Sequence, residues 1–259
     1  MIDYKVGIVI PTMGLRTEYL KEAIMSVRNA GRCFILIVTP NPILLVESGL
    51  DELVEQIEND RGSGLTESIN LGISALPQSV EFVNWLGDDD RLSPDSITLT
   101  SNFLLRNPSV DCVFGRCSLI DEHGRVLWHN RSGSWATWFM RFGPCLIPQP
   151  GALFRRSSFE RIGELNPGYN YAFDLDLWIR FSTTGKMSFL DAHLGDFRWH
   201  SDSKTVSNRI ASIKESEQVR NSHQSKFSRL ISPIWEIPLT YFSAMAGIMI
   251  SRRIKTSRA

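Results

Sequence analysis

Three consecutive aspartates, Asp88, Asp89 and Asp90, directly follow the apolar segment Val80–Leu86 and Gly87. Adjacent carboxylates repel one another, and each costs free energy to remove from water. Mg²⁺ and Mn²⁺ prefer oxygen ligands and are commonly held by one or two carboxylates together with substrate phosphates. The three aspartates therefore predict a divalent-metal site that faces a diphosphate, and the alternative is an acidic surface turn without a ligand.

A second pair of carboxylates, Asp174 and Asp176, lies in the helical pattern FDLDLWIR. Helix residues two positions apart point in different directions, so at most one of the two is expected to face a pocket. Asp176 is the better candidate for a structural role, either at the helix start or paired with Arg180. His200 is a candidate metal or diphosphate ligand, with a purely structural histidine as the alternative, and Arg198 is a candidate phosphate partner.

Alternating strands and helices in the first half of the chain must position these groups. This alternation predicts an α/β, Rossmann-like fold with a mostly parallel central sheet and flanking helices. Ligands of such sheets bind beyond the carboxyl ends of the strands, where Pro11, Thr12 and the three aspartates are expected to lie. The expected strands are Tyr4–Pro11, Phe34–Val38 and Val80–Leu86, and the expected helices are Thr17–Ala30, Leu65–Leu76 and Pro94–Arg106.

The pattern changes after Val110–Phe114, where a hairpin is expected through residues 119–129. Residues 1–208 are predicted to form the α/β domain, and residues 209–259 a helical C-terminal extension. Residues 231–250 of this extension are strongly apolar and precede a basic end. Two prolines and a glutamate interrupt them, so the uninterrupted part is shorter than the roughly 20 residues of a membrane-spanning helix. Two alternatives remain for this segment: an interfacial helix with a basic anchor, and a helix packed on the core or on a second subunit.

Net charge, the N-terminal segment and the cysteines bear on the partners and the location of the protein. Lys and Arg total 28, as do Asp and Glu, so global charge does not point to nucleic acid. The opening segment MIDYKVGIVIPT has no basic region of a signal peptide. The four cysteines have no CxxC spacing and are predicted to be buried free thiols, with zinc or disulfides as alternatives. A cytoplasmic protein, peripheral at the inner face of the membrane, is the resulting expectation.

Seven motifs in one order give the chain its resemblance to a known family. They are VGIVIPT, GLTESINLGISA, WLGDDDRLSPDSI, FGRCSLIDEHG, QPGALFRRSSFERIG, YAFDLDLWIRF and FRWHSDSKTVS. Their order resembles that of the inverting, nucleotide-sugar-dependent glycosyltransferases of family 2, which have the GT-A fold. The resemblance covers most of residues 5–208 and implies transfer of a sugar from a nucleoside-diphosphate donor to a glycan or lipid-linked acceptor in bacterial surface-polysaccharide synthesis.

The resemblance also implies roles for individual residues. Asp174 would be the catalytic base, while Asp89 and Asp90, with His200, would hold Mn²⁺ or Mg²⁺. The residues implied for nucleotide-sugar binding are Pro11, Thr12, Asp60, Arg61, Asn70 and Asp88.

This sequence departs from the family pattern at three places. Gly87 stands where the usual first aspartate of the acidic motif would be, and Phe173 replaces the first member of the acidic pair that ends at Asp174. The turn after the second strand, residues 39–42, is Thr-Pro-Asn-Pro rather than acidic, so the identity of the base stays open. Two other functions remain as alternatives: a sugar nucleotidyltransferase and a non-catalytic nucleotide- or glycan-binding protein.

Overall fold

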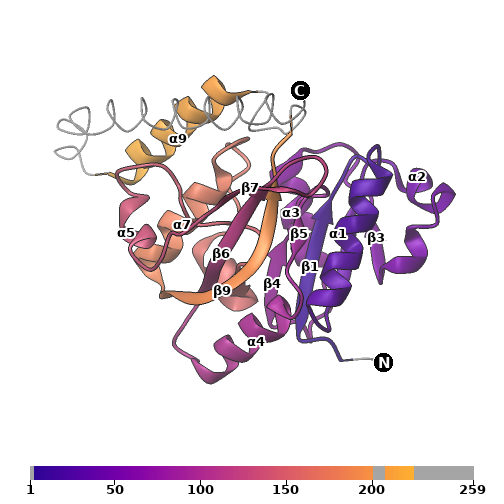
Figure 1. The fold of residues 1–259 in the computed structure, drawn as a ribbon, viewed down its shortest axis with the longest axis horizontal. Coiled ribbons are helices and arrows are strands. Elements are labelled where there is room, and N and C mark those ends of the chain that lie inside the picture. The colour runs from indigo at the N-terminus through magenta and orange to yellow at the C-terminus, as the bar shows by residue number, and fades with distance from the viewer. Residues whose placement is uncertain (1–2, 201–207, 225–259) are drawn as a thin grey trace.

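The computed structural model describes residues 3–200 and 208–224, in which nine strands form one sheet in the order β3-β2-β1-β4-β8-β6-β9-β5, with β7 paired to β6 (Figure 1). The N-terminal strands β1 to β4 pair in parallel, as do β6 and β9, whereas β4–β8, β8–β6, β6–β7 and β5–β9 are antiparallel. The strands are β1 (Val6–Pro11), β2 (Phe34–Val38), β3 (Gln56–Glu58), β4 (Phe82–Trp85), β5 (Arg91–Leu92), β6 (Cys112–Ile120), β7 (Val126–His129), β8 (Leu153–Arg155) and β9 (Met187–Arg198).

Helices cover both faces of the sheet because successive strand residues point to opposite sides. Val9 of β1 packs in one apolar cluster with α3, α6 and α7, while Ile8 and Ile10 pack in the other with α1 and α4. Figure 1 shows α2 and β3 at one end of the molecule and α5, α7 and α9 at the other. The helices are α1 (Thr17–Ala30), α2 (Pro42–Glu47), η1 (Asp51–Leu53), α3 (Leu65–Ala75), α4 (Ser96–Arg106), α5 (Ala136–Phe139), α6 (Arg156–Ile162), α7 (Phe173–Thr184) and α9 (Arg209–His223).

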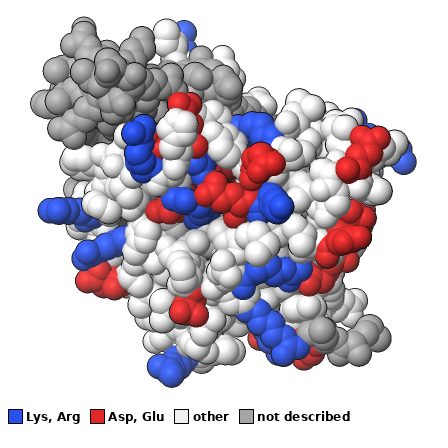
Figure 2. All heavy atoms as spheres, turned by 45° about the vertical axis from the view of Figure 1, so that its right-hand side comes forward, with Lys and Arg blue, Asp and Glu red and all other residues white. Residues whose placement is uncertain are grey.

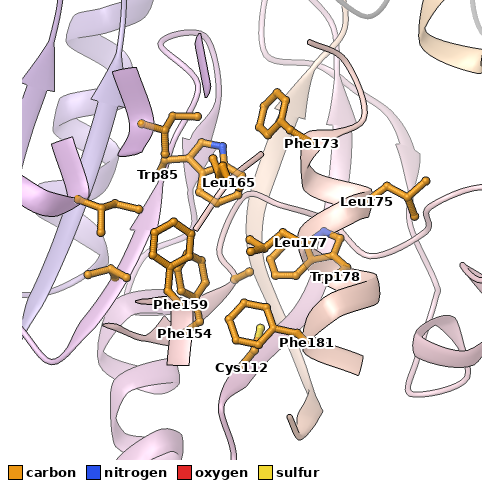
Figure 3. Packing of buried hydrophobic residues seen from close by; sticks show 14 of the residues in the cluster. Trp85, Cys112, Phe154, Phe159, Leu165, Phe173, Leu175, Leu177, Trp178 and Phe181 are labelled. Atoms are coloured by element: carbon orange, nitrogen blue, oxygen red, sulfur yellow. The ribbon is translucent and has the colours of Figure 1, made fainter. Parts of the chain in front are cut away.

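Aromatic packing fixes α7 against the sheet. Trp85 of β4 stacks on Trp178 of α7 with ring centroids 6.5 Å apart, and Phe154 of β8 contacts both rings (Figure 3). Phe181 adds a further ring from the next turn of α7. Buried aromatic side chains supply large apolar areas and restrict how two elements can shift. The first turn of α7 is therefore held in a defined position relative to the end of β4.

The expected α/β class is confirmed, and the strands and helices of the first half lie close to their expected bounds. The expected parallel pairing holds from β1 to β4 and between β6 and β9, while β8, β7 and β5 run antiparallel to their neighbours. Among the described residues, no helix has the length and apolar character needed to cross a membrane. The predicted apolar segment 231–250 lies outside the described residues.

Candidate active site

A cavity of about 540 Å³ lies at the carboxyl ends of β1 and β4 and extends to the first turn of α7. The loop that precedes α3 forms another part of its wall. A parallel sheet leaves such a crevice where its loops diverge. Of the residues predicted for the site, seven line the cavity: Pro11, Thr12, Asp60, Asp88, Asp89, Asp90 and Asp174.

Arg16, which the sequence did not single out for this site, binds two of the three aspartates. It lies just before α1, where its guanidinium pairs with Asp88 through Nη2 and with Asp89 Oδ2 through Nη1 at 3.0 Å. Thr12 at the end of β1 donates its hydroxyl to Asp88 Oδ2 at 2.6 Å. The positive partner that the aspartates require is therefore present within the chain itself.

His200 completes this group from the end of β9. Its Nε2 lies 2.7 Å from Asp89 Oδ2 and 3.1 Å from Nη1 of Arg16. The antiparallel pairing of β5 with β9, with Arg91 opposite Asp196, carries His200 to the aspartates. An oxygen and a nitrogen this close repel through their lone pairs unless a proton or a cation lies between them.

Asp90 has a different environment from its two neighbours. It is 5% exposed, and its Oδ1 accepts a hydrogen bond from the backbone N–H of Arg198 at 2.8 Å. Burial, together with the charge of Asp89, raises the pKa of Asp90 well above its ordinary value. A Cβ atom at Gly87 would lie 2.8 Å from Asp90 Oδ2, so the turn as built favours glycine at that position.

The two aspartates that contact Arg16 also differ in acidity. Burial raises the pKa of Asp88, and the charge of Arg16 and the hydroxyl of Thr12 offset this only in part. Burial acts in the same direction on Asp89, but the hydrogen bond with His200 and the charge of Arg16 outweigh it and lower the pKa of Asp89. Asp89 is therefore the member of the three that stays ionised most readily.

Asp89 and His200 fit a divalent cation by the chemistry and spacing of their ligand atoms. An octahedral Mg²⁺ or Mn²⁺ with ligands about 2.1 Å away places adjacent ligand atoms about 3.0 Å apart, close to the observed 2.7 Å. Within residues 3–200 and 208–224, no group of three or more acidic, histidine or cysteine side chains is arranged around a metal position. The pair would thus supply two ligands of a cation, and water or oxygens of a bound ligand would supply the others.

Asp174 lies at the α7 end of the cavity and is only partly exposed there. Its Oδ1 accepts the N–H of Leu175 at 2.7 Å. Burial is the main cause that raises the pKa of Asp174 to about 6, and the negative charge of Glu215 adds to it. A carboxylate with this pKa is ionised at neutral pH and is a stronger base than a free aspartate.

Glu215 of α9 holds the segment that leads into α7. Its Oε1 accepts the backbone N–H groups of Tyr171 and Ala172 at 2.6 and 2.7 Å. A carboxylate at a helix N-terminus binds N–H groups that lack partners within the helix. Through these contacts α9 supports the position of Asp174.

We expect Glu215→Ala to lower the free energy of unfolding by about 1–3 kcal/mol, because it leaves two N–H groups near the start of α7 without this acceptor. Urea denaturation would measure the loss. Gln218→Ala, an exposed position on the same helix, is the control and is expected to change little. Equal stability of the Glu215→Ala protein and the control would contradict the supporting role.

Asp176 points away from this cavity. It forms an ion pair with Arg180 at 2.7 Å, and its Oδ1 lies 2.7 Å from Nε2 of His223. The predicted pairing with Arg180 is confirmed. The hydrogen bond with His223 and the charge of Arg180 outweigh burial and lower the pKa of Asp176. Asp176 joins α7 to α9 and does not line the cavity.

Three other residues lie elsewhere than the sequence suggested. The amide of Asn70 exchanges two hydrogen bonds with the backbone of Leu165, so it fastens α3 to the loop after α6. Arg61 is exposed in a tight turn with a positive φ of 54° and does not line the cavity. Arg198 is 1% exposed and directs its guanidinium to backbone carbonyls and Glu22 instead of the cavity.

Comparison with known proteins finds relatives at low identity. An uncharacterized glycosyltransferase of Rickettsia felis is 28% identical over 155 residues, covering 56% of this chain and 25% of that protein. A second, from Rickettsia conorii, is 26% identical over 220 residues, covering 78% of this chain and 36% of that protein. The chain thus spans well under half the length of these relatives. No family model matches the sequence.

Solved structures resemble this chain over most of its length, at lower sequence identity. Residues 1–349 of S. aureus TarS in complex with UDP-GlcNAc align with a TM-score of 0.59 and 15% identity, covering 83% of this chain and 64% of that one. A mannosyltransferase from Pyrobaculum calidifontis in complex with GDP-Man and Mn²⁺ aligns with a TM-score of 0.64 and 12% identity, covering 100% and 80%. At these identities the likeness shows the fold alone. Together, the names of the relatives and the shared mixed α/β fold support a glycosyltransferase.

Proposed function

We propose that this chain is an inverting glycosyltransferase of the family 2 type, which moves a sugar from a nucleoside-diphosphate donor to a hydroxyl of a glycan or lipid-linked acceptor. The observation that carries the proposal is that one cavity joins the Asp88–Asp90 group and Arg16 to Asp174. Inverting transfer needs this combination: positive charge for the leaving diphosphate and a base for the acceptor hydroxyl.

In the proposed reaction the acceptor oxygen attacks the anomeric carbon and forms the new glycosidic bond. The bond from that carbon to the diphosphate breaks on the opposite side, and the diphosphate leaves with the electron pair. Asp174 takes the proton of the acceptor hydroxyl, for which its raised pKa of about 6 is well suited at neutral pH. Asp89 and His200 would hold Mn²⁺ or Mg²⁺, which when bound would supply positive charge to the leaving group.

Nucleotide recognition is proposed for the residues around the end of β1. Pro11 and Thr12 would lie against the base, and Asp88 would hold the ribose. Asp60 lines the cavity, where it accepts hydrogen bonds from Ser68 of α3 and from the N–H of Gly62, and it would offer the base a further polar contact. The TarS structure in complex with UDP-GlcNAc and the mannosyltransferase structure in complex with GDP-Man and Mn²⁺ support a donor of this class.

A role in bacterial surface-polysaccharide synthesis, at the cytoplasmic face of the inner membrane, is part of the proposal. It rests on the family resemblance and on the apolar, basic-ended segment after residue 230. On the face of the molecule drawn in Figure 2, acidic and basic side chains are interspersed and form no broad positive patch. That mixture suits a small anionic ligand held by a few groups better than nucleic acid on this face.

We expect Asp89→Asn to abolish metal-dependent binding of the donor, because it replaces the carboxylate that lies against both Arg16 and His200. Calorimetry would screen UDP-, GDP- and dTDP-sugars with Mn²⁺, with Mg²⁺ and with a chelator. Asp174→Asn is the matched control at the other end of the cavity and is expected to keep donor binding. Absence of binding by any nucleotide under every metal condition would refute the proposed activity.

Two further measurements separate the alternatives: binding of nucleoside triphosphates and sugar phosphates, and sugar transfer by the Asp174→Asn protein. A sugar nucleotidyltransferase would bind a nucleoside triphosphate and a sugar phosphate in place of the nucleotide sugar. The loop after β1 offers this chemistry little, since it supplies only Gly14 and Arg16 where a glycine-rich loop with a basic residue would be needed. A non-catalytic binding protein would bind nucleotide or glycan, and Asp174→Asn would change nothing that can be measured.

A further inference from the structure

Arg16 contacts the two atoms, Asp89 Oδ2 and His200 Nε2, to which a divalent cation would bind. Its Nη1 lies 3.0 Å from Asp89 Oδ2 and 3.1 Å from His200 Nε2, and these two atoms are 2.7 Å apart. A cation bound to the same oxygen and nitrogen with bonds of about 2.1 Å would lie no more than about 4.3 Å from Nη1, whichever side of the two atoms it took. Two positive charges at such a separation repel strongly, more so in a partly buried cavity than in water.

We propose that Arg16 and the divalent cation exclude each other from Asp89 and His200, and that the donor's diphosphate accepts the displaced guanidinium. This inference rests on the proposed function. Arg16 is then a positioning residue that couples two binding events. The cation binds poorly without the nucleotide, because it must break the contact between Arg16 and Asp89 and leave the guanidinium with one partner fewer.

The diphosphate compensates for this loss. Guanidinium groups bind phosphate oxygens through two parallel hydrogen bonds, and such charge-assisted pairs are among the stronger ones. Arg16 already lines the cavity, so a change of side-chain rotamer is sufficient to reach a ligand there. Because coupling between two ligands is reciprocal, the nucleotide raises the affinity for the cation by the same factor as the cation raises that for the nucleotide.

The surroundings of Arg16 allow this movement. Its side chain is 36% exposed, and it precedes α1 without a side-chain hydrogen bond to the helix start. Asp88 keeps the hydroxyl of Thr12 when the guanidinium leaves, and Thr12 also accepts the N–H of Gly14. The carboxylate of Asp88 is therefore not left without a partner. Water reaches the guanidinium, whereas the side chains of Asp88 and Asp89 are only 10% and 16% exposed, so the exchange of partners begins from the arginine side of the ion pair.

The test is a titration of Mn²⁺ followed by electron paramagnetic resonance, without nucleotide and with saturating UDP, GDP or dTDP. For the wild type we expect the nucleotide to raise the Mn²⁺ affinity about tenfold or more. For Arg16→Gln we expect tighter binding of Mn²⁺ alone and a coupling factor of about threefold or less. Arg106→Gln, at the exposed end of α4, is the matched control and keeps the wild-type coupling.

Each outcome decides the inference. Unchanged Mn²⁺ affinity and unchanged coupling in Arg16→Gln overturn the role of Arg16 and leave the proposed function intact. A wild-type protein that binds no nucleoside diphosphate, with or without Mn²⁺, overturns both. Circular dichroism checks that the variant is folded, and Arg16→Lys replaces it if it is not. Lysine keeps the charge but has no planar fork, so it is expected to compete with Mn²⁺ while giving a smaller coupling.

Discussion

Asp174→Asn is expected to lower kcat about 10²–10⁴-fold while leaving the affinity for the donor nucleotide unchanged. The asparagine preserves size and most of the packing at the first turn of α7, but its amide cannot take a proton from the acceptor hydroxyl. Steady-state kinetics with the donor found by calorimetry would measure the loss. Asp176→Asn is the control two residues away: it removes the negative charge that pairs with Arg180 and His223, and so should affect stability more than kcat.

The same residue sets the expected pH dependence. Because burial raises the pKa of Asp174 to about 6, the base is protonated and inactive below that pH and ionised above it. Activity should therefore fall about tenfold per pH unit as the pH drops below about 6, whereas a free aspartate would keep its activity down to about pH 4. A profile that is flat between pH 4.5 and 7 would contradict the assignment of Asp174 as the base.

Arg198→Met is expected to lower the free energy of unfolding by about 3–5 kcal/mol, because backbone carbonyls lose a charged donor and each buried group left unsatisfied costs about 1–3 kcal/mol. The guanidinium is 1% exposed and donates to the carbonyls of Asp89 and Glu122 at 2.7 and 3.0 Å and to Glu22 at 2.5 Å. Methionine fills part of the volume but leaves these oxygens without their donor. Urea denaturation at neutral pH would measure the difference.

Arg91→Met is the matched control for Arg198→Met. Arg91 also pairs with Glu22, and in addition with Asp196, but its side chain is 25% exposed. Water can replace its hydrogen bonds, so the expected cost is about 1 kcal/mol. If the two variants lose the same stability, the buried network around Arg198 is not what holds the end of β9 against the aspartates.

The spacing of apolar residues predicted those helices and strands that are long enough to show a full apolar repeat. The apolar spacing of Thr17–Ala30 and the apolar segment Phe34–Val38 correspond to α1 and β2 as the structure has them. The region between β2 and α3 was less well predicted: α2, η1 and the three-residue β3 are short, and none has room for a full apolar repeat. Antiparallel pairing beyond β4 depends on distant partners and leaves no periodic signal in either strand.

Some residues of the candidate site were also predicted from the sequence, and others were revealed only by the structure. The carboxylates of Asp88 and Asp89 were found from residue type and from their place at the end of a strand, whereas Asp174 was identified through the family resemblance. All three line one cavity. Arg16 belongs to the segment that follows the first strand, but its pairing with the aspartates was not predicted, although three adjacent carboxylates require a cation nearby. Asn70 has a polar side chain on a predicted helix near the cavity, but only the fold reveals that Leu165 uses both of its hydrogen-bonding groups.

Because β5 pairs with β9, the surroundings of the three aspartates can form only after β9 has been synthesised. β5 has only two residues, Arg91 and Leu92, and pairs with Gly195 and Asp196 of β9, so the contact between Arg91 and Asp196 spans 105 positions. Bringing together two strands so far apart in the sequence costs chain entropy, and contacts between residues close in the sequence do not offset that cost. During synthesis the parallel strands β1 to β4 emerge with all three aspartates, but His200 and Arg198 are translated about a hundred residues later. The carboxylates thus gain two of their partners only when the last strand docks.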